Sequence, residues 1–376
     1  MIDDVGRAGG AAQGLVAMAP QLVRAGVRLD VAYLRESPGG FQPELTGAGA
    51  DVFGVGRATR ARTAAALRRM VRERRPDLVH TTLYESDVLG RAAAFAARTP
   101  VVSSLVDPAY GPGHLGARGA GPWKVRAAQA VDAATAQGTR RFHALSRYVA
   151  GAMAQRLRVP RERIDVVPRG RDPEVLGTVT PDRRAAVRAA LGLPQDVPVV
   201  LAAARHEYRK GLDVLLEAWP GVLRAAPEAV LLLAGGEGGE TPRLTALARA
   251  AGSVRLLGPR DDVFDLMAAS DALAVPSRWE GFGSAAMEGM GVGVPLVCAD
   301  VPALRETVGS EDYARLVPPE RPAELAAALT DTLEDRSAAR MRAKAARARF
   351  LTAFTLHQVS GRMVEFYERS LRLRRV

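Results

Sequence analysis

The sequence predicts an α/β protein with two domains, each built on a parallel sheet. The chain has 376 residues, which is too long for one hydrophobic core and suits two units of roughly 150–200 residues. Short apolar runs with β character alternate with amphipathic segments of helix length, and this alternation is typical of βαβ units and parallel sheets. A polar stretch of low periodicity at residues 168–181 indicates the linker, so we expect domains at residues 1–171 and 172–355.

The expected strands are the apolar runs at residues 27–34, 77–80, 101–105, 164–167, 197–203, 229–234, 254–257, 272–275 and 296–298. Most of them are separated by a single segment of helix length. A last amphipathic helix is expected at about residues 356–371, where apolar side chains recur at helical spacing.

Composition limits the class of protein. No apolar run reaches the ~18–20 residues of a membrane span, and no secretory signal precedes the first helix, so we expect a cytoplasmic protein. The one cysteine, Cys298, excludes an internal disulfide and a zinc cluster built on cysteine. Its apolar neighbours indicate a buried strand end rather than a nucleophile.

The positive charge is concentrated in the first domain. The chain has a formal net charge of +11, and residues 1–172 hold 26 Arg and Lys against 15 Asp and Glu, whereas the remainder holds 26 of each. The densest run, residues 57–75, predicts a basic helix with a modest apolar stripe of Ala64, Leu67, Met70 and Val71. One interpretation is attraction to an anionic membrane surface or an anionic acceptor; the other is an ordinary solvated helix. Nucleic acid is not expected, because no aromatic residues interleave with the arginines to stack bases.

The most informative segment is residues 276–288, where two glutamates, Glu280 and Glu288, stand eight residues apart. An apolar run precedes it, Gly-Phe-Gly follows the first glutamate, and helix-compatible residues start at Ser284. A strand, a tight loop and a helix N-terminus together present free backbone N–H groups to an anion. Glu280 is suited to sugar hydroxyls and Glu288 to a vicinal diol such as ribose. The pattern favours a nucleotide-sugar site over two solvated glutamates in an ordinary strand-turn-helix.

This segment, with Gly-Val-Pro-Leu-Val at residues 293–297, resembles the signature of the family-4 retaining glycosyltransferases with the GT-B fold. The resemblance runs over nearly the whole chain. It implies two Rossmann-like domains that face each other across a cleft, with the nucleotide-sugar donor on the second domain and the acceptor on the first. It also implies that a helix at about residues 356–376 packs back on the first domain. Besides Glu280 and Glu288, it marks Gly281, Phe282, Gly283 and Ser284 as donor-binding residues.

A second constellation lies at residues 204–211, directly after an expected strand. It resembles the Gly-Arg-x-x-x-x-Lys-Gly of the same family, with Ala204 in place of the glycine. Arg205 can fork onto two phosphate oxygens while Lys210 acts as a point charge. Such cations neutralise the charge that grows on a departing diphosphate. They also stand where a divalent metal would, so neither a metal nor another cofactor is expected. Outside this context, an Arg and a Lys in a loop are usually solvated surface charges.

Weaker elements complete the expected donor site. Gly9 and Gly10 match the family loop that faces the diphosphate across the cleft, although a Gly-Gly pair by itself is more often an ordinary turn. Gly235 begins a glycine-rich loop after an expected strand. Arg260 lies where the family cups the base by backbone contacts.

The sequence also departs from the family. A histidine that lies near the reacting sugar in many members is replaced here by Val106, and neither Asp107 nor His114 aligns with it. We expect His80 to be structural or to line the cleft, and His143 to be a strand-edge residue rather than a catalyst.

Two departures concern the first domain's framework. Arg169-Gly170 replaces the usual Asn-Gly before the linker. The chain begins almost at the Gly9-Gly10 loop, so most of a central strand is expected to be missing. Either the start is assigned too late, or the sheet lacks a strand and is weakened.

The resemblance implies a retaining transferase that moves a hexose-type sugar from a nucleoside diphosphate sugar to an acceptor hydroxyl, with Arg205, Lys210 and Glu280 as the catalytic set. UDP-sugar is the expected donor and GDP-sugar the runner-up. A UDP-sugar epimerase of the same fold is an alternative, and a weakly active anion-binding protein is another.

Overall fold

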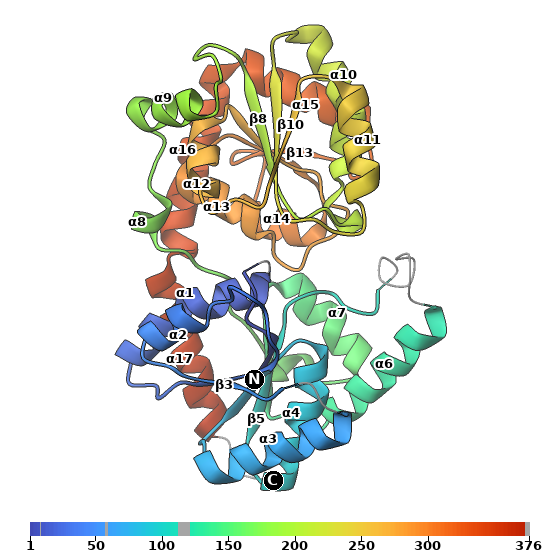
Figure 1. Ribbon diagram of the computed structural model, residues 1–376, viewed down its shortest axis with the longest axis vertical. Helices are drawn as coiled ribbons and strands as arrows, with labels where there is room; N and C mark the ends of the chain where they lie inside the picture. Colours follow the sequence, from blue (N-terminus) through green and yellow to red (C-terminus); the bar gives the residue numbers. More distant parts are fainter. Residues whose placement is uncertain (8, 57–58, 112–120, 373–376) are drawn as a thin grey trace. The chain divides into compact units, whose positions relative to one another are not determined.

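The structure is a computed structural model, and it describes residues 1–7, 9–56, 59–111 and 121–372. The chain divides into two compact units. The first unit contains residues 1–170 together with the carboxyl-terminal segment that begins at Leu356, and the second runs from Arg171 to Thr355. Both are α/β units with parallel sheets (Figure 1), as the sequence predicts.

The first unit has a seven-stranded sheet in the order β3-β2-β1-β4-β5-β6-β7. Its strands are β1 (Ile2–Asp4), β2 (Asp30–Arg35), β3 (Asp51–Gly54), β4 (Val79–Thr82), β5 (Val101–Leu105), β6 (Arg141–Ala144) and β7 (Ile164–Val166). Its helices are α1 (Gly10–Arg24), α2 (Gln42–Gly47), α3 (Arg60–Arg74), α4 (Tyr84–Ala97), α6 (Pro122–Ala136), α7 (Arg147–Leu157), the short η1 (Arg161–Arg163) and the carboxyl-terminal α17 (Leu356–Arg372).

The first strand of the chain, β1, is an interior strand of this sheet and is short. Ile2 of β1 pairs with Tyr33 of β2 on one side and with Thr82 of β4 on the other. The alternative that the sheet lacks this strand is therefore wrong, because the three residues of β1 lie in the interior of the sheet, between β2 and β4.

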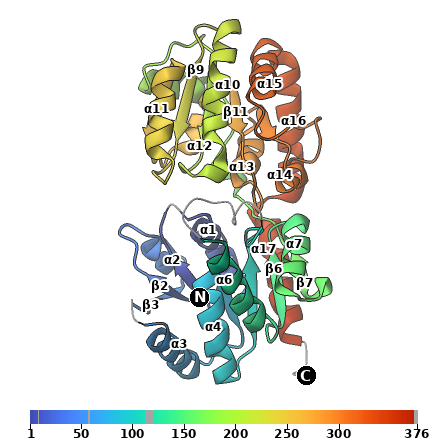
Figure 2. The ribbon, with the colours of Figure 1, turned by 90° about the vertical axis from the view of Figure 1, so that its right-hand side faces the viewer.

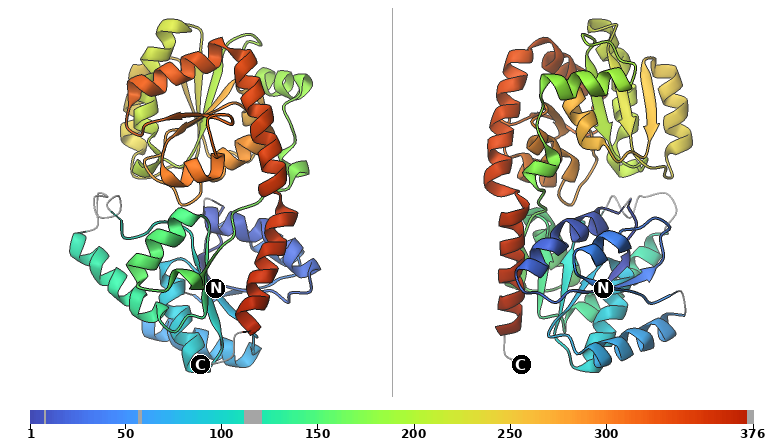
Figure 3. Two further views of the ribbon diagram at one scale, coloured as in Figure 1. Left: turned by 180° about the vertical axis from the view of Figure 1, so that it is seen from behind. Right: turned by 60° about the vertical axis from the view of Figure 1, so that its left-hand side comes forward.

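Helix α17 packs on the first unit because one of its faces is apolar. Val359, Met363 and Phe366 of this helix are buried against Leu22 of α1 and Val102 of β5. Figure 3 shows α17 lying along the first unit. On the other side of the sheet, α4 lies beside both α3 and α6 (Figure 2).

The second unit has a six-stranded sheet in the order β10-β9-β8-β11-β12-β13. Its strands are β8 (Val199–Ala203), β9 (Val230–Ala234), β10 (Val254–Gly258), β11 (Ala272–Val275), β12 (Leu296–Ala299) and β13 (Arg315–Val317). Its helices are α8 (Pro173–Leu176), α9 (Pro181–Ala190), η2 (Tyr208–Lys210), α10 (Leu212–Ala225), α11 (Thr241–Ala251), α12 (Val263–Ala269), α13 (Ser284–Val292), α14 (Pro302–Val308), α15 (Pro322–Glu334) and α16 (Arg336–Ala353).

The core of the second unit holds the strands in place, and with them the strand ends that are described below. Trp219 and Leu215 of α10 are fully buried with Leu231 of β9 and Leu329 of α15. The strand order reverses between β8 and β11. In open α/β sheets, ligands bind outside the carboxyl ends of the strands at such a reversal.

Candidate functional site

The loops after β8, β9, β10 and β11 form one connected layer at the carboxyl edge of the second sheet. The amide of His206 donates to the carbonyl of Gly236 at 3.0 Å, and the amide of Gly235 donates to the carbonyl of Gly258 at 2.8 Å. The amide of Arg278 donates to the carbonyl of Arg209, also at 2.8 Å. The predicted residues from four separate segments are therefore held on a single backbone framework.

Glu280 is the centre of this layer. Its side chain is buried, and Oε1 lies 2.5 Å from Lys210 Nζ and accepts a hydrogen bond from Ser277 Oγ at 2.9 Å. Arg209 Nη1 donates to Oε2 at 3.2 Å. Burial by itself would raise the pKa of the Glu280 carboxyl, but the charges of Lys210 and Arg209 and the two hydrogen bonds outweigh it and lower that pKa. Glu280 is thus a fixed carboxylate that orients Lys210.

Arg205 lies at the same edge but is more accessible. Its side chain is 39% exposed and pairs with Glu207 at 2.7 Å, and Glu207 also accepts from Arg209 at 2.8 Å. A guanidinium has five N–H donors, so the donors that do not face Glu207 can bind another group. Arg205 and Lys210 are therefore two oriented cations on one loop.

The Gly-Phe-Gly loop presents the start of α13. Gly283 has φ +91, and a side chain there would collide with Leu304, so this turn needs glycine. No side chain caps the N-terminus of α13 in the part of the chain that the structure describes. The first N–H groups of the helix, from Ser284 onward, are thus suited to an anion. Phe282 is buried edge-to-face against Phe354, so its side chain is a packing group of this loop.

Glu288 is held separately from Glu280. It lies one turn into α13, and its Oε1 accepts from Arg171 Nε at 2.8 Å and lies 2.7 Å from Arg171 Nη2. Both residues are buried. The sequence signal for Glu288 did not reveal this partner, because Arg171 is 117 residues away along the chain.

The two weaker predictions for the donor site, Gly235 and Arg260, differ in their surroundings. A side chain on Gly235 would collide with the carbonyl of Ala204, so this glycine allows β8 and β9 to end close together. Arg260 is at the surface and forms a bidentate pair with Asp262, with distances of 2.8 and 2.6 Å. Its guanidinium is thereby committed to its own loop.

In the first unit, Gly9 and Gly10 form the start of α1, with Gly9 as its N-cap. The guanidinium of Arg169 donates to the carbonyl of Gly10. The arginine that replaces the usual asparagine is therefore a cation beside the predicted glycine loop. Its position in the motif was visible in the sequence, but its contact was not.

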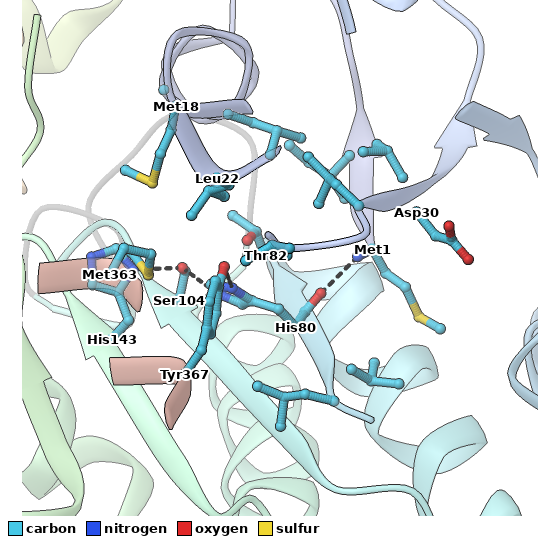
Figure 4. Close-up of a pocket in the computed structure, with 18 of the residues that line it drawn as sticks. Met1, Met18, Leu22, Asp30, His80, Thr82, Ser104, His143, Met363 and Tyr367 are labelled. Atoms are coloured by element: carbon cyan, nitrogen blue, oxygen red, sulfur yellow. Dashed lines mark hydrogen bonds between the residues drawn. The ribbon is translucent and has the colours of Figure 1, made fainter. Parts of the chain in front are cut away.

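Four polar side chains of the first unit form a hydrogen-bonded chain (Figure 4). Ser104 and His143 are buried, and His80 and Tyr367 are half-buried. His143 Nε2 is 2.8 Å from the carbonyl of Val167, an acceptor, so this nitrogen carries the proton. His143 Nδ1 then accepts from Ser104 Oγ at 2.8 Å, Ser104 accepts from His80 Nε2 at 2.7 Å, and His80 Nδ1 accepts from the Tyr367 hydroxyl at 2.8 Å. Both histidines are therefore neutral, and the chain links α17 to β4, β5 and β6.

Burial explains the protonation states of this chain. It lowers the pKa of His143 to about 4 and the pKa of His80 well below its usual range. The prediction that His143 lies at a strand edge is wrong, because β6 is an interior strand between β5 and β7. Val106 and Asp107 follow β5 as expected, and His114 lies outside the described residues.

Several other sequence predictions concern the whole chain. Cys298 is buried, and burial raises the pKa of its thiol to about 12, as suits a core residue. Among the described residues, no group of three or more His, Cys, Asp or Glu side chains is arranged to hold a metal ion. No helix in the described ranges is long and apolar enough to cross a membrane.

Comparison with protein families gives two matches that together extend over most of the chain. Residues 9–170 match the family "Glycosyl transferase 4-like domain", and residues 183–349 match "Glycosyl transferases group 1". A D-inositol 3-phosphate glycosyltransferase from Kineococcus radiotolerans is 32% identical over 335 residues, which is 80% of this chain and 73% of the relative. The same-named enzyme of Saccharomonospora viridis is 40% identical over 151 residues. That match spans 37% of this chain and about a third (35%) of the relative's length.

Solved structures agree on the fold. Anabaena HepE in complex with UDP and glucose has a TM-score of 0.86 at 23% identity, with 98% of each chain covered. WaaG, described as a glycosyltransferase involved in lipopolysaccharide biosynthesis, has a TM-score of 0.77 at 17% identity, with 97% of this chain and 99% of that chain covered.

Proposed function

This chain belongs to the family-4-type glycosyltransferases with the GT-B fold, and we propose that it transfers a sugar from a nucleoside diphosphate sugar to an acceptor hydroxyl. The observation that carries the proposal is the arrangement of Arg205, Lys210 and Glu280 at the carboxyl edge of the second sheet. The uncapped start of α13 adds backbone donors at the end of a neighbouring strand. A diphosphate leaving group needs this combination of cations and N–H donors.

We propose a UDP-sugar with a hexose-type sugar as the donor. The support comes from similar proteins: HepE has been solved with UDP-glucose, and the sequence relatives are named as inositol-phosphate glycosyltransferases. GDP-sugar is the second candidate. Glu288 is the residue that we assign to the ribose diol, because a carboxylate fixed by Arg171 on one oxygen keeps lone pairs for two hydroxyl donors.

We propose that transfer retains the anomeric configuration and needs no metal. As the glycosidic bond breaks, Arg205 and Lys210 stabilise the negative charge that develops on the diphosphate. The leaving phosphate assists removal of the proton from the acceptor hydroxyl on the same face of the sugar. Glu280 holds Lys210 in place, and its carboxylate has about four acceptor positions, so it also has capacity for a sugar hydroxyl.

Two alternatives stay open. A UDP-sugar epimerase of the same fold would use the same diphosphate cations, and it would convert the donor with no acceptor present. A weakly active anion-binding protein would use the basic surface of the first unit, and it would bind polyanions without turnover.

The test starts with the donor and then follows the product. A thermal-shift panel of UDP, GDP and ADP sugars identifies the nucleotide, and the stabilising donor is then incubated with D-inositol 3-phosphate and other polyols. NMR of the product reports the configuration at the anomeric carbon. We expect a glycoside with the configuration of the donor.

The matched variants are Lys210→Ala and Lys344→Ala, since Lys344 is exposed on α16. Turnover should be lost in the first and kept in the second. Conversion of the donor alone would favour the epimerase, and polyanion binding without any turnover would favour the binding protein.

A further inference from the structure

His206 is a buried histidine next to the cation Arg205, in the loop that follows β8. The residue is only 4% exposed. Its Nδ1 lies 3.0 Å from the hydroxyl of Thr241, which is the first residue of α11. Its Nε2 is buried and has no hydrogen-bond partner among the described residues. The contact with Thr241 is therefore the one hydrogen bond of this ring in the part of the chain that the structure describes.

The hydrogen-bond partners of Thr241 define the protonation of His206. The Thr241 hydroxyl oxygen accepts from the amide of Gly238 at 2.9 Å, so its proton is available to Nδ1 of His206. The reverse arrangement, with the imidazole proton on Nδ1, would leave both the hydroxyl proton and the lone pair of Nε2 without a partner, at a cost for each buried group. Burial also lowers the pKa of His206, and the opposing effect of Glu237 is smaller. His206 is therefore neutral, and its Nδ1 accepts from Thr241.

The backbone of His206 is joined to the glycine-rich loop that follows β9. Its amide donates to the carbonyl of Gly236 at 3.0 Å, and its carbonyl accepts from the amide of Glu240 at 3.1 Å. A side chain on Gly238 would collide with that carbonyl, so the two loops are in close contact at this point. The residue that follows Arg205 is thus fixed by both of its backbone groups and by its side chain.

Arg205 itself has fewer restraints. Its side chain is 39% exposed and pairs with Glu207 at 2.7 Å. The guanidinium lies at the end of a long side chain, so a small rotation of the backbone displaces it by a larger distance. A displacement of about 1 Å at a catalytic group can cost ~10²-fold in rate. The orientation of this cation therefore depends on how firmly its loop is held.

We propose that His206 is a positioning residue for Arg205, because it binds the Arg205 loop to the start of α11 through Thr241. This inference rests on the proposed function, in which Arg205 acts on the donor diphosphate. The imidazole suits this place, since the ring fills a buried position while Nδ1 offers an acceptor to the Thr241 hydroxyl. An apolar side chain of similar size would fill the space but would leave that hydroxyl without its acceptor. His206 acts through Arg205 and needs no contact with the substrate.

Matched variants separate the hydrogen bond from the volume of the side chain. His206→Leu keeps a buried side chain of similar size and removes the acceptor, whereas His206→Asn keeps an oxygen that can accept from Thr241. Thr245→Val is the control, since the Thr245 hydroxyl donates to the carbonyl of Thr241 within the same helix, at 2.9 Å. His206→Leu is also combined with Arg205→Ala.

Steady-state kinetics on these proteins tests the proposal. We expect His206→Leu to lower kcat roughly tenfold with little change in the donor KM, because a contact made in the transition state is weakened. His206→Asn should recover most of this loss, and Thr245→Val should keep its kcat. In the Arg205→Ala background, His206→Leu should lower kcat by less than about twofold, because the residue through which it acts is absent.

A second measurement needs no substrate. Amide hydrogen exchange at Gly238 and Glu240 should be roughly tenfold faster in His206→Leu than in the unaltered protein, and exchange in β12 should not change. An equal loss of kcat from His206→Leu with and without Arg205 would overturn the inference, because the effect would then not pass through this cation. Unchanged kcat and unchanged exchange in His206→Leu would overturn it as well.

Failure of the proposed function gives a different result. If the protein binds UDP or GDP but transfers no sugar, the proposed function fails, and calorimetric nucleotide affinity replaces kcat in the same set of variants. Equal losses of affinity from His206→Leu with and without Arg205 would then overturn the inference, and a loss confined to the protein that keeps Arg205 would support it. Binding of neither nucleotide by the unaltered protein would overturn both.

Discussion

The two units are built on the same kind of parallel sheet, but the polar side chains singled out in each of them differ in charge. In the second unit, the carboxyl edge holds charged groups in pairs, such as Lys210 with Glu280 and Arg205 with Glu207. In the first unit, the hydrogen-bonded chain across β4, β5 and β6 is neutral, because His80 and His143 each use one ring nitrogen as a donor and the other as an acceptor. A buried ion pair of Arg91 with Asp132 lies elsewhere in the same unit. The predicted donor-binding cations Arg205 and Lys210 thus differ from this neutral chain, because each of them is oriented by a carboxylate.

The net charge shows the reverse distribution. The surplus of basic residues lies in residues 1–172, while the rest of the chain is balanced. Net charge alone therefore does not locate the proposed donor site. In the second unit, orientation by a buried carboxylate distinguishes Lys210 from a solvated lysine such as Lys344.

The largest expected effect is that of Arg205→Ala, which removes one of the two oriented cations of the second unit. We expect kcat to fall by ~10²-fold or more, because a preorganised charge donor to the leaving group is removed. Steady-state kinetics with the identified donor measures the effect. Arg315→Ala, which removes a partly exposed arginine paired with Asp331 in the same unit, is the control and should keep its kcat. An unchanged kcat in Arg205→Ala would remove this residue from the proposed mechanism.

Glu288→Gln tests the second charged pair. The amide keeps a hydrogen bond to Arg171 but loses the negative charge, so nucleotide binding should weaken by about 1.5–3 kcal/mol, the range for hydrogen bonds to a charged group. Glutamine is preferred to alanine because alanine would leave the buried Arg171 without this carboxylate and would destabilise the fold. Calorimetry with UDP measures the affinity, and urea unfolding checks the stability. Full affinity in a folded variant would argue against the ribose assignment.

The neutral chain of the first unit predicts a pH dependence of stability. The unfolded histidines have a pKa near 6.5, whereas the folded pKa of His143 is about 4 and that of His80 is also lowered. At these two histidines the unfolded state therefore binds more protons below pH ~6.5, and their contribution to stability, complete above this pH, declines as the pH falls toward about 4.

A variant isolates this contribution from other titrating groups. His143→Gln removes one of the two protons taken up on unfolding, so the slope of unfolding free energy between pH 6 and pH 5 should become smaller by about 1.4 kcal/mol per pH unit. Urea unfolding at several pH values measures both slopes. Identical slopes in the two proteins would mean that His143 does not stay neutral in the fold.

A smaller effect is expected for membrane binding by the basic surface of α3 in the first unit. Leu67 and Val71 of α3 are buried in the core, so the apolar stripe expected from the sequence faces inward and the exposed side of the helix is mainly arginine. If this side attracts an anionic membrane, Arg69→Gln should reduce partition onto anionic vesicles about fivefold, at ~1 kcal/mol for one basic residue. Arg340→Gln on α16, also exposed, is the matched control. Equal recovery of the protein with neutral and anionic vesicles would leave α3 as a solvated helix.

The sequence predicted the fold where strands are apolar on both faces, and it missed strands where they are short or polar. Each of the nine expected runs overlaps a strand of the structure. β6 was missed because Arg141 and His143 interrupt its apolar pattern, and β3 and β13 were missed because each contains only two consecutive apolar residues. β1 was missed because Ile2 is its one apolar residue.

For the candidate site, the motifs located the loops but not their partners. Arg205, Lys210, Glu280 and the α13 start were all identified from local patterns, since a strand end followed by glycine and a helix has a recognisable sequence. The contacts of Arg171 with Glu288 and of Arg169 with Gly10 join segments more than a hundred residues apart. Such pairs depend on tertiary packing, which no local pattern contains.

The smallest expected effect is that of a chelator. Arg205 and Lys210 occupy the place that a divalent ion would take beside a diphosphate, and a guanidinium and an ammonium keep their charge at neutral pH without any exchangeable ligand. Turnover in excess EDTA should therefore equal turnover in buffer, and added Mg²⁺ or Mn²⁺ should not increase it.

The Lys210→Ala variant gives a more specific test, because the missing cation leaves room for a metal ion. If Mg²⁺ partly restores that variant but does nothing to the unaltered protein, the lysine is acting as the substitute for the ion. Loss of activity of the unaltered protein on chelation, with recovery on adding metal, would show that the charged pairs of the second unit are not sufficient for the leaving group.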